Sequence, residues 1–194
     1  IYVHIAPQLA KLRQKIAVPC DAAVDRIVAN NMIASQEKQE YLGSLGISID
    51  WLQTGFMEEV QAAEELSTVD GFPFETTATV YDIEPQVICS KGADTICPVD
   101  GRLGSSYVHA LLELQKKQEI PPDVVGPANY MLSYGWGYKV KDIVDTLADF
   151  CETNSLDPKT TYVWICCLCN NQHRVQERLK TGETVPFEEF RQVF

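Results

Sequence analysis

Apolar residues recur at helical spacing through most of the first 69 residues. One such face ends at Pro19, and a second stretch begins at Asp21, a good N-terminal capping residue. A third stretch covers residues 50–66 after two glycines. The sequence therefore predicts an acidic helical region over residues 1–69. The apolar positions of its three helices are Ile5, Leu9, Leu12 and Ile16; Val24, Ile27 and Val28; and Leu52, Phe56, Val60, Ala63 and Leu66.

The helical pattern breaks over residues 70–104, where glycine and proline interrupt the chain repeatedly. Thr76–Tyr81 and Gln86–Cys89 have the β-branched and apolar composition of short strands. We expect an irregular connector here. Ser105 or Ser106 then caps another amphipathic helix, which Pro121 ends.

A strand, a helix and a second strand are predicted between residues 130 and 167. Tyr130–Ser133 is a short apolar run, and the residues from Val140 to Cys151 place their apolar side chains on one helical face. Thr161–Cys167 is almost continuously apolar, as in a strand that is buried on both faces. Such a unit is a βαβ crossover, and its two strands run parallel.

Parallel neighbouring strands end at the same edge of a sheet, where open α/β folds bind ligands. Two loops should meet there. Their glycines allow close backbone approach, their aromatic rings can stack on a planar group, and their amides can pair with a base or sugar. These features suit a nucleotide-like ligand, but the structural alternative is favoured and we assign no cofactor. The alternative is that the glycines turn the chain, the tryptophan packs in the core and the amides cap the next helix. The loop residues are Ser133, Tyr134, Gly135, Trp136 and Gly137, and Asn170, Asn171 and Gln172.

Charge and composition restrict the classes of partner. The formal net charge of −11 repels phosphate backbones and anionic lipid headgroups, which argues against nucleic acid and membrane surfaces. No apolar run approaches the roughly 18 residues of a membrane helix. An odd count of 7 cysteines does not resemble a secreted disulfide framework, so we expect a soluble protein in a reducing compartment. The chain begins with Ile1, which is compatible with a leader that was removed on import into an organelle such as a plastid. A cytoplasmic location is equally compatible with the sequence.

Sulfur-bearing and basic side chains cluster at Cys166, Cys167, Cys169 and His173. Neighbouring residues on a strand face opposite sides, so Cys166 and Cys167 are poorly placed to bind one metal ion, and we assign no metal site. Cys169 could act as a nucleophile with His173 as its general base only if the segment after the strand is helical, which would bring the two residues one turn apart.

Two further features of the connector invite a chemical interpretation. Cys89 and Cys97 could pair or ligate a metal, but unpaired thiols are the favoured interpretation. The turn from Gly101 to Ser106 could hold an anion, but no lysine follows it and a capping turn is the better interpretation.

The run from Leu132 to Gly137 and the run from Val163 to Gln172 together resemble the S-Y-x-W-G and W-I-D-x-x-C-I-N-Q pair of heterokaryon-incompatibility domains, within the wider Toll/interleukin-receptor (TIR)-like group. Cys97–Arg102 and Val185–Phe190 resemble an uncharacterised branch of that group in dinoflagellates and other secondary-plastid algae. The resemblance covers residues 97–194. It implies a flavodoxin-like parallel sheet, self-association or scaffold assembly, and in some members cleavage of NAD.

Two differences from the family pattern argue against an NAD-cleaving activity. Cys166 stands where the heterokaryon pattern has an acid, and the sequence ends at Phe194 before the segment that supplies a catalytic Glu in the NAD-cleaving members. We therefore assign no catalytic residue. Asp142 is the one nearby carboxylate that could serve such a site.

The sequence as a whole predicts an α/β fold with a flavodoxin-like, TIR-like partial parallel sheet over residues 105–194, preceded by the helical region and the connector. Pro186–Phe194 begins an amphipathic helix, so we expect it and the Trp136 loop to contact a protein partner. The leading hypothesis is a non-catalytic assembly subunit. The alternative is a nucleotide-binding or NAD-cleaving enzyme, and a weaker third is a metal-dependent redox protein that uses the cysteine group.

Overall fold

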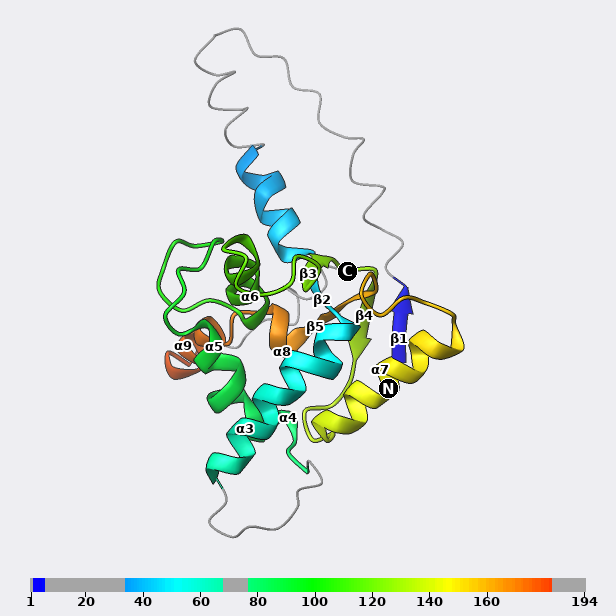
Figure 1. Ribbon diagram of the computed structural model, residues 1–194. Coiled ribbons are helices and arrows are strands. Elements are labelled where there is room, and N and C mark those ends of the chain that lie inside the picture. The colour runs from blue at the N-terminus through cyan, green and yellow to red at the C-terminus, as the bar shows by residue number, and fades with distance from the viewer. Residues whose placement is uncertain (1, 6–33, 68–76, 183–194) are drawn as a thin grey trace, which may run out of the picture.

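The computed structural model describes residues 2–5, 34–67 and 77–182. Its centre is a mixed, open sheet with the strand order β1-β4-β5-β2-β3 (Figure 1). The strands are β1 (Tyr2–Ile5), β2 (Leu45–Ser48), β3 (Val125–Pro127), β4 (Tyr130–Ser133) and β5 (Tyr162–Ile165). The β4–β5 pair is parallel, whereas the pairs β1–β4, β5–β2 and β2–β3 are antiparallel. The fold class α/β is therefore confirmed, but a flavodoxin-like, parallel sheet is not.

The predicted βαβ unit is present. Helix α7 (Val140–Thr153) connects β4 to β5, and Met131 lies opposite Trp164 in the parallel register. Val140, Val144 and Leu147 on the inner face of α7 are buried. The ring of Tyr130 on β4 meets the ring of Phe150 on α7 edge-on, with their centroids 5.1 Å apart. This packing fixes the helix over the two strands.

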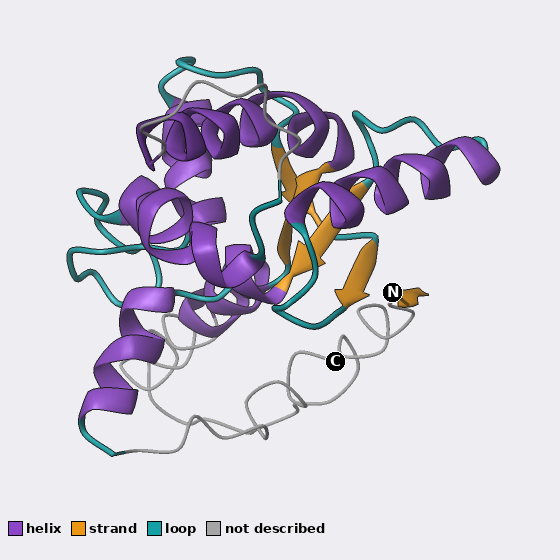
Figure 2. Cartoon of the chain, turned by 90° about the horizontal axis from the view of Figure 1, so that it is seen from below, coloured by secondary structure: helices purple, strands orange, loops and turns teal. Residues whose placement is uncertain are grey.

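Helices cover the sheet, as Figures 1 and 2 show. A continuous helical segment runs from Ile49 to Ser67, as predicted for residues 50–66, and its part from Ile49 to Phe56 contacts α7. The helix α6 begins after the cap Ser106, whose side chain accepts from the His109 N–H at 3.2 Å, as predicted. The helical elements are a segment over residues 34–43, α2 (Ile49–Trp51), the π-helical η2 (Leu52–Phe56), α3 (Met57–Ser67), α4 (Val80–Ile83), the π-helical η3 (Glu84–Cys89), α5 (Ser90–Gly92), α6 (Tyr107–Lys116), α7, α8 (Cys166–Cys169) and α9 (Gln172–Lys180).

β5 is enclosed on both faces. Val163 and Ile165 belong to the main hydrophobic core, and Trp164 between them is also buried. The indole Nε1 of Trp164 donates to the carbonyl of Gly43, where the helical segment 34–43 ends, at 3.2 Å. Both faces of β5 are therefore covered, as its apolar run predicted.

One hydrophobic core joins the described parts of the three predicted segments. Its buried residues come from 42–60, 78–112 and 124–168. The predicted division at residues 69 and 104 therefore does not separate independent cores. β2 from the first segment lies between β5 and β3 of the last one.

Several sequence-based assignments are wrong. Ile5 lies in β1, because residues 2–5 pair with β4, and the other apolar positions of the first two predicted helices lie outside the described residues. Thr77–Tyr81 and Gln86–Cys89 are not strands, and Thr76 lies outside the described residues. Val80 begins α4, where the Asp82 carboxylate accepts from the Thr79 N–H and hydroxyl at 2.8 and 2.7 Å, and Gln86–Cys89 lie in η3. Local capping therefore prevails over the β-branched composition.

The outer edge of strand β3 is hydrogen-bonded by the side chain of Gln115. The Gln115 Oε1 accepts from the Val125 N–H at 2.8 Å, and the Gln115 Nε2 donates to the Val125 carbonyl at 3.2 Å. Pro127, two residues further on, has no N–H to offer. The side-chain amide of α6 thus takes the place of a neighbouring strand.

Gly46 permits the close approach of β2 to β5. A Cβ on Gly46 would lie 2.8 Å from the carbonyl carbon and oxygen of Val163. A Cβ on Gly43 would meet nothing within 4 Å, which makes Gly43 a matched control.

We expect Gly46→Ala to lower the free energy of unfolding by about 1–3 kcal/mol, because two backbones must separate to admit the methyl group. Gly43→Ala should leave stability unchanged or slightly raised. Urea unfolding followed by circular dichroism measures both. Equal stabilities for the two variants would contradict the β2–β5 contact.

Candidate functional site

The Trp136 loop, which follows β4, meets the start of α8, which follows β5. Tyr134 follows β4 and Cys166 follows β5, and the Cys166 thiol donates to the Tyr134 hydroxyl oxygen at 3.5 Å. Burial, followed by the neighbouring Cys167 and Cys166, raises the pKa of Tyr134, so this phenol stays protonated. The βαβ geometry therefore places Tyr134 beside Cys166, and the nucleotide pocket between the two loops stays a prediction.

The Trp136 loop forms an aromatic surface with α4. Trp136 is half-buried, and its ring lies 5.4 Å from the ring of Tyr81 at an interplanar angle of 57°. Tyr81 and Tyr138 are 66% and 49% exposed. We call Tyr81, Trp136 and Tyr138 the aromatic surface. Ser133, Gly135 and Gly137 of this loop are exposed.

The amides of the second loop serve the protein's own backbone. Asn171 caps α9, where its Oδ1 accepts from the His173 N–H at 3.1 Å, and its Nδ2 donates to the Gly104 carbonyl at 2.9 Å. Gln172 is buried, and its Nε2 donates to the carbonyls of Cys166, Cys167 and Asn170. These contacts match the capping alternative for Asn171, whereas Gln172 bonds carbonyls of the preceding turn and does not cap α9. Asn170 is half-buried beside them.

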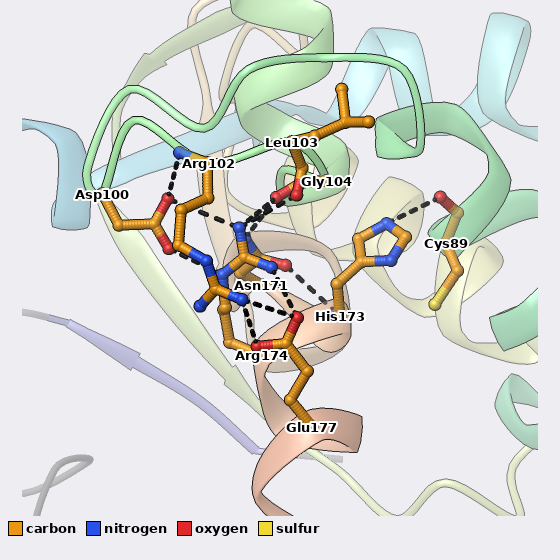
Figure 3. Close-up of polar contacts among 9 residues, drawn as sticks. All are labelled: Cys89, Asp100, Arg102, Leu103, Gly104, Asn171, His173, Arg174 and Glu177. Carbon is orange, nitrogen blue, oxygen red and sulfur yellow. Dashed lines mark hydrogen bonds and ion pairs between the residues drawn. The ribbon is translucent and has the colours of Figure 1, made fainter.

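A polar cluster that the sequence did not predict joins the turn 95–104 to α9 (Figure 3). Arg174 is its centre: Nε lies 2.6 Å from the Asp100 Oδ2, and Nη2 donates to the carbonyls of Leu103 and Gly104 at 3.0 and 3.2 Å. Glu177 bridges Arg174 and Arg102, with ion pairs of 3.0 and 2.8 Å. Arg174 and Glu177 are three residues apart on one helix face, which is the one local signal of this cluster.

Arg174 also lowers the pKa of Asp100. Its hydrogen bonds hold the pKa of Asp100 well below the usual range, so the carboxylate is ionised at neutral pH. The turn offers Arg174 carbonyl oxygens, while the N–H groups of Gly101, Gly104 and Ser105 donate to the carbonyls of Cys97, Thr95 and Gly92. These N–H groups are thus not available to an anion, which favours a capping turn over an anion site.

One expectation for the cysteines, the strand position of Cys166 and Cys167, is wrong. Cys166 and Cys167 are not on a strand, because β5 ends at Ile165 and α8 begins with Cys166. Cys89 and Cys97 are free thiols. Within the described ranges, no group of three His, Cys, Asp or Glu side chains is arranged to hold a metal ion.

The hypothesis of Cys169 and His173 as nucleophile and base finds no supporting contact. The Nε2 of His173 lies 3.1 Å from the Cys89 carbonyl oxygen, and the Cys169 Sγ accepts from the Ile165 N–H at 3.3 Å. Each group therefore faces a backbone partner. Burial also raises the pKa of Cys169, which disfavours its thiolate.

The comparisons add no relative. The searches against family models, curated proteins and solved structures found no match to this chain. Among the described residues, no helix combines the length and apolar character needed to cross a membrane.

We expect Arg174→Met to lower the free energy of unfolding at pH 7 by about 2 kcal/mol, because Asp100 and two carbonyls lose a charged donor. Lys180→Met, an exposed position on the same helix, is the control. Because the pKa of Asp100 is lower in the folded state, its stabilisation is full above the unfolded value of about 4 and is lost as the pH falls below it.

Urea unfolding between about pH 6 and pH 3 should therefore show a flatter pH dependence for Arg174→Met than for the wild type. Parallel curves for the wild type, Arg174→Met and Lys180→Met would mean that the ion pair does not hold the turn to α9.

Proposed function

We propose that this chain is a protein-interaction module, an assembly subunit that docks through its aromatic surface. The observation that supports this proposal is the exposure of Tyr81, whose ring lies against the half-buried Trp136, and of Tyr138 in the same loop as Trp136. Tyrosine and tryptophan are enriched at interfaces, where they combine large apolar area with few rotatable bonds. In this proposal the TIR-like resemblance describes the module, with the βαβ unit as its flavodoxin-like part.

The aromatic surface is built on a fixed backbone. Thr79 and Lys139 form an antiparallel bridge, and the Val140 N–H donates to the Ala78 carbonyl at 2.9 Å. The Tyr138 N–H donates to the Gly135 carbonyl at 3.1 Å, which closes the loop around Trp136. A preorganised surface loses little conformational entropy on binding, and this favours a docking role.

The partner in this proposal is a protein of net positive charge with an apolar contact patch. The net charge of −11 steers such a partner toward the chain over long range, and the three rings supply the short-range contact. The predicted contribution of Pro186–Phe194 lies outside the described residues.

Site-specific photo-crosslinking tests the docking proposal. p-Benzoylphenylalanine placed at Tyr81 or Tyr138 should yield a defined adduct with one basic protein in the source cells. The same probe at Tyr41, which is 52% exposed in the helical segment 34–43, should not. Purified partner should bind the Trp136→Ala variant about thirty-fold more weakly, the effect of losing one aromatic hot spot.

Tyr41→Ala is the matched control and should bind the partner as the wild type does. Thermal unfolding shows whether Trp136→Ala is folded. Equal crosslinking from positions 41, 81 and 138, or an affinity that is insensitive to Trp136→Ala, would overturn the docking proposal.

NAD turnover separates this proposal from the enzymatic alternative. We expect no release of nicotinamide from NAD, because Asn171 and Gln172 already bond the backbone and Asp142 is exposed on the first turn of α7. Chromatography of the incubated mixture measures the product. Turnover that disappears in both Trp136→Ala and Asp142→Ala would establish the enzyme and overturn the non-catalytic proposal.

A further inference from the structure

Two cysteines lie one helical turn apart where β5 ends. Cys166 begins α8 and Cys169 ends it, and the Asn170 N–H closes the turn by donating to the Cys166 carbonyl at 3.1 Å. In an α-helix, residues i and i+3 have Cα atoms about 5 Å apart. That separation lies inside the window of disulfide-bonded cysteines, so a bond between the two requires side-chain rotation and little backbone movement.

The side chains distinguish this pair from the third cysteine of the turn. The Cys169 Sγ is folded back over the start of the turn, 3.3 Å from the Ile165 nitrogen and thus beside Cys166. Cys167 is 3% exposed and belongs to the main core. Cys167 also lies beside the Tyr134 hydroxyl that Cys166 contacts, so its burial in the core is what separates it from the other two.

The two thiols also differ in their surroundings. Both residues are partly exposed, and the Cys166 thiol contacts the Tyr134 hydroxyl. Cys169 is packed against the core, and its thiol contacts the backbone of β5. An accessible cysteine followed after two residues by a more enclosed one is the arrangement of dithiol redox motifs, in which the first thiol attacks and the second resolves.

We infer that Cys166 and Cys169 form a reversible dithiol–disulfide couple whose substrates are disulfides and dithiols. This activity is separate from the docking proposal and does not depend on it. It needs no metal, in contrast to the metal-dependent redox hypothesis drawn from the sequence.

The exchange balances with a disulfide such as glutathione disulfide as the oxidant. The Cys166 thiol releases its proton to water, and the thiolate attacks one sulfur of glutathione disulfide. One glutathione leaves as its thiolate and is protonated. The Cys169 thiol then loses its proton and attacks the Cys166 Sγ, which expels the second glutathione. Two electrons and two protons pass from the protein to two glutathione molecules, and a dithiol reverses the reaction.

The surrounding structure fits a local exchange. The Gln172 Nε2 donates to the carbonyls of Cys166 and Cys167, which ties the turn to α9 while the side chains rotate. Oxidation breaks the hydrogen bond from the Cys166 thiol to the Tyr134 hydroxyl, because the disulfide has no proton to donate. We therefore expect the disulfide to form without unfolding of the chain.

Alkylation and mass spectrometry in a glutathione redox buffer test the couple. Cleavage after Lys159 and Arg174 yields a peptide that contains Cys166, Cys167 and Cys169 and no other cysteine. In the full chain with Cys167→Ala, oxidised buffer should make this peptide lighter by two hydrogen atoms and resistant to alkylation. Dithiothreitol should restore both thiols. Fragmentation of the wild-type peptide should locate the same bond, so the test does not rely on the folding of the variant.

Single replacements assign the roles. Cys169→Ser should accumulate one glutathione on Cys166, because the resolving thiol is missing, and Cys166→Ser should form neither adduct nor disulfide. Cys151→Ser, which removes a buried thiol from α7, should oxidise as the wild type does. Two alkylatable thiols that persist in oxidised Cys167→Ala, a wild-type bond to Cys167 or to another cysteine, or glutathione on Cys169 in Cys166→Ser would each overturn the couple.

Discussion

The burial of β5 on both faces and its pairing on both edges is the constraint on which the rest of the described structure depends. Val163 and Ile165 face the main core, Trp164 is anchored to the Gly43 carbonyl, β4 lies parallel on one side and β2 antiparallel on the other. No residue of this strand can be shifted without exposing a large apolar side chain or an unpaired amide. Since β5 ends at Ile165, its position fixes α8, the Tyr134 contact and the start of α9.

The elements that the sequence predicted well are those whose own residues determine them. The apolar face from Val140 to Cys151 identifies α7, and the apolar run before Cys166 identifies β5. The crossover rule then places Tyr134 near Cys166 without any further information. Ser106 identifies the start of α6 because a capping side chain acts within its own turn.

The elements that were missed depend on distant partners. β2 is four residues long and contains Gly46, so it has no periodicity of its own and is a strand because β5 and β3 pair with it. The Arg174–Asp100 ion pair joins residues 74 positions apart, and no local pattern encodes it. The contact between Tyr81 and Trp136 was not predicted, because Thr76–Tyr81 was predicted to be a strand. The capping bonds of Asp82 instead start a helix at Val80.

The outer side of β3 has a consequence for how this molecule can associate. An exposed strand edge is a template on which another chain can add a strand and from which aggregates grow. The bidentate bonding of Val125 by Gln115, followed by a proline, removes the backbone groups that such an addition would use. A strand from another chain could pair with β3 only after displacing the Gln115 side-chain amide from Val125. On that side of the molecule, complexes therefore form more readily through side-chain contacts than through strand addition.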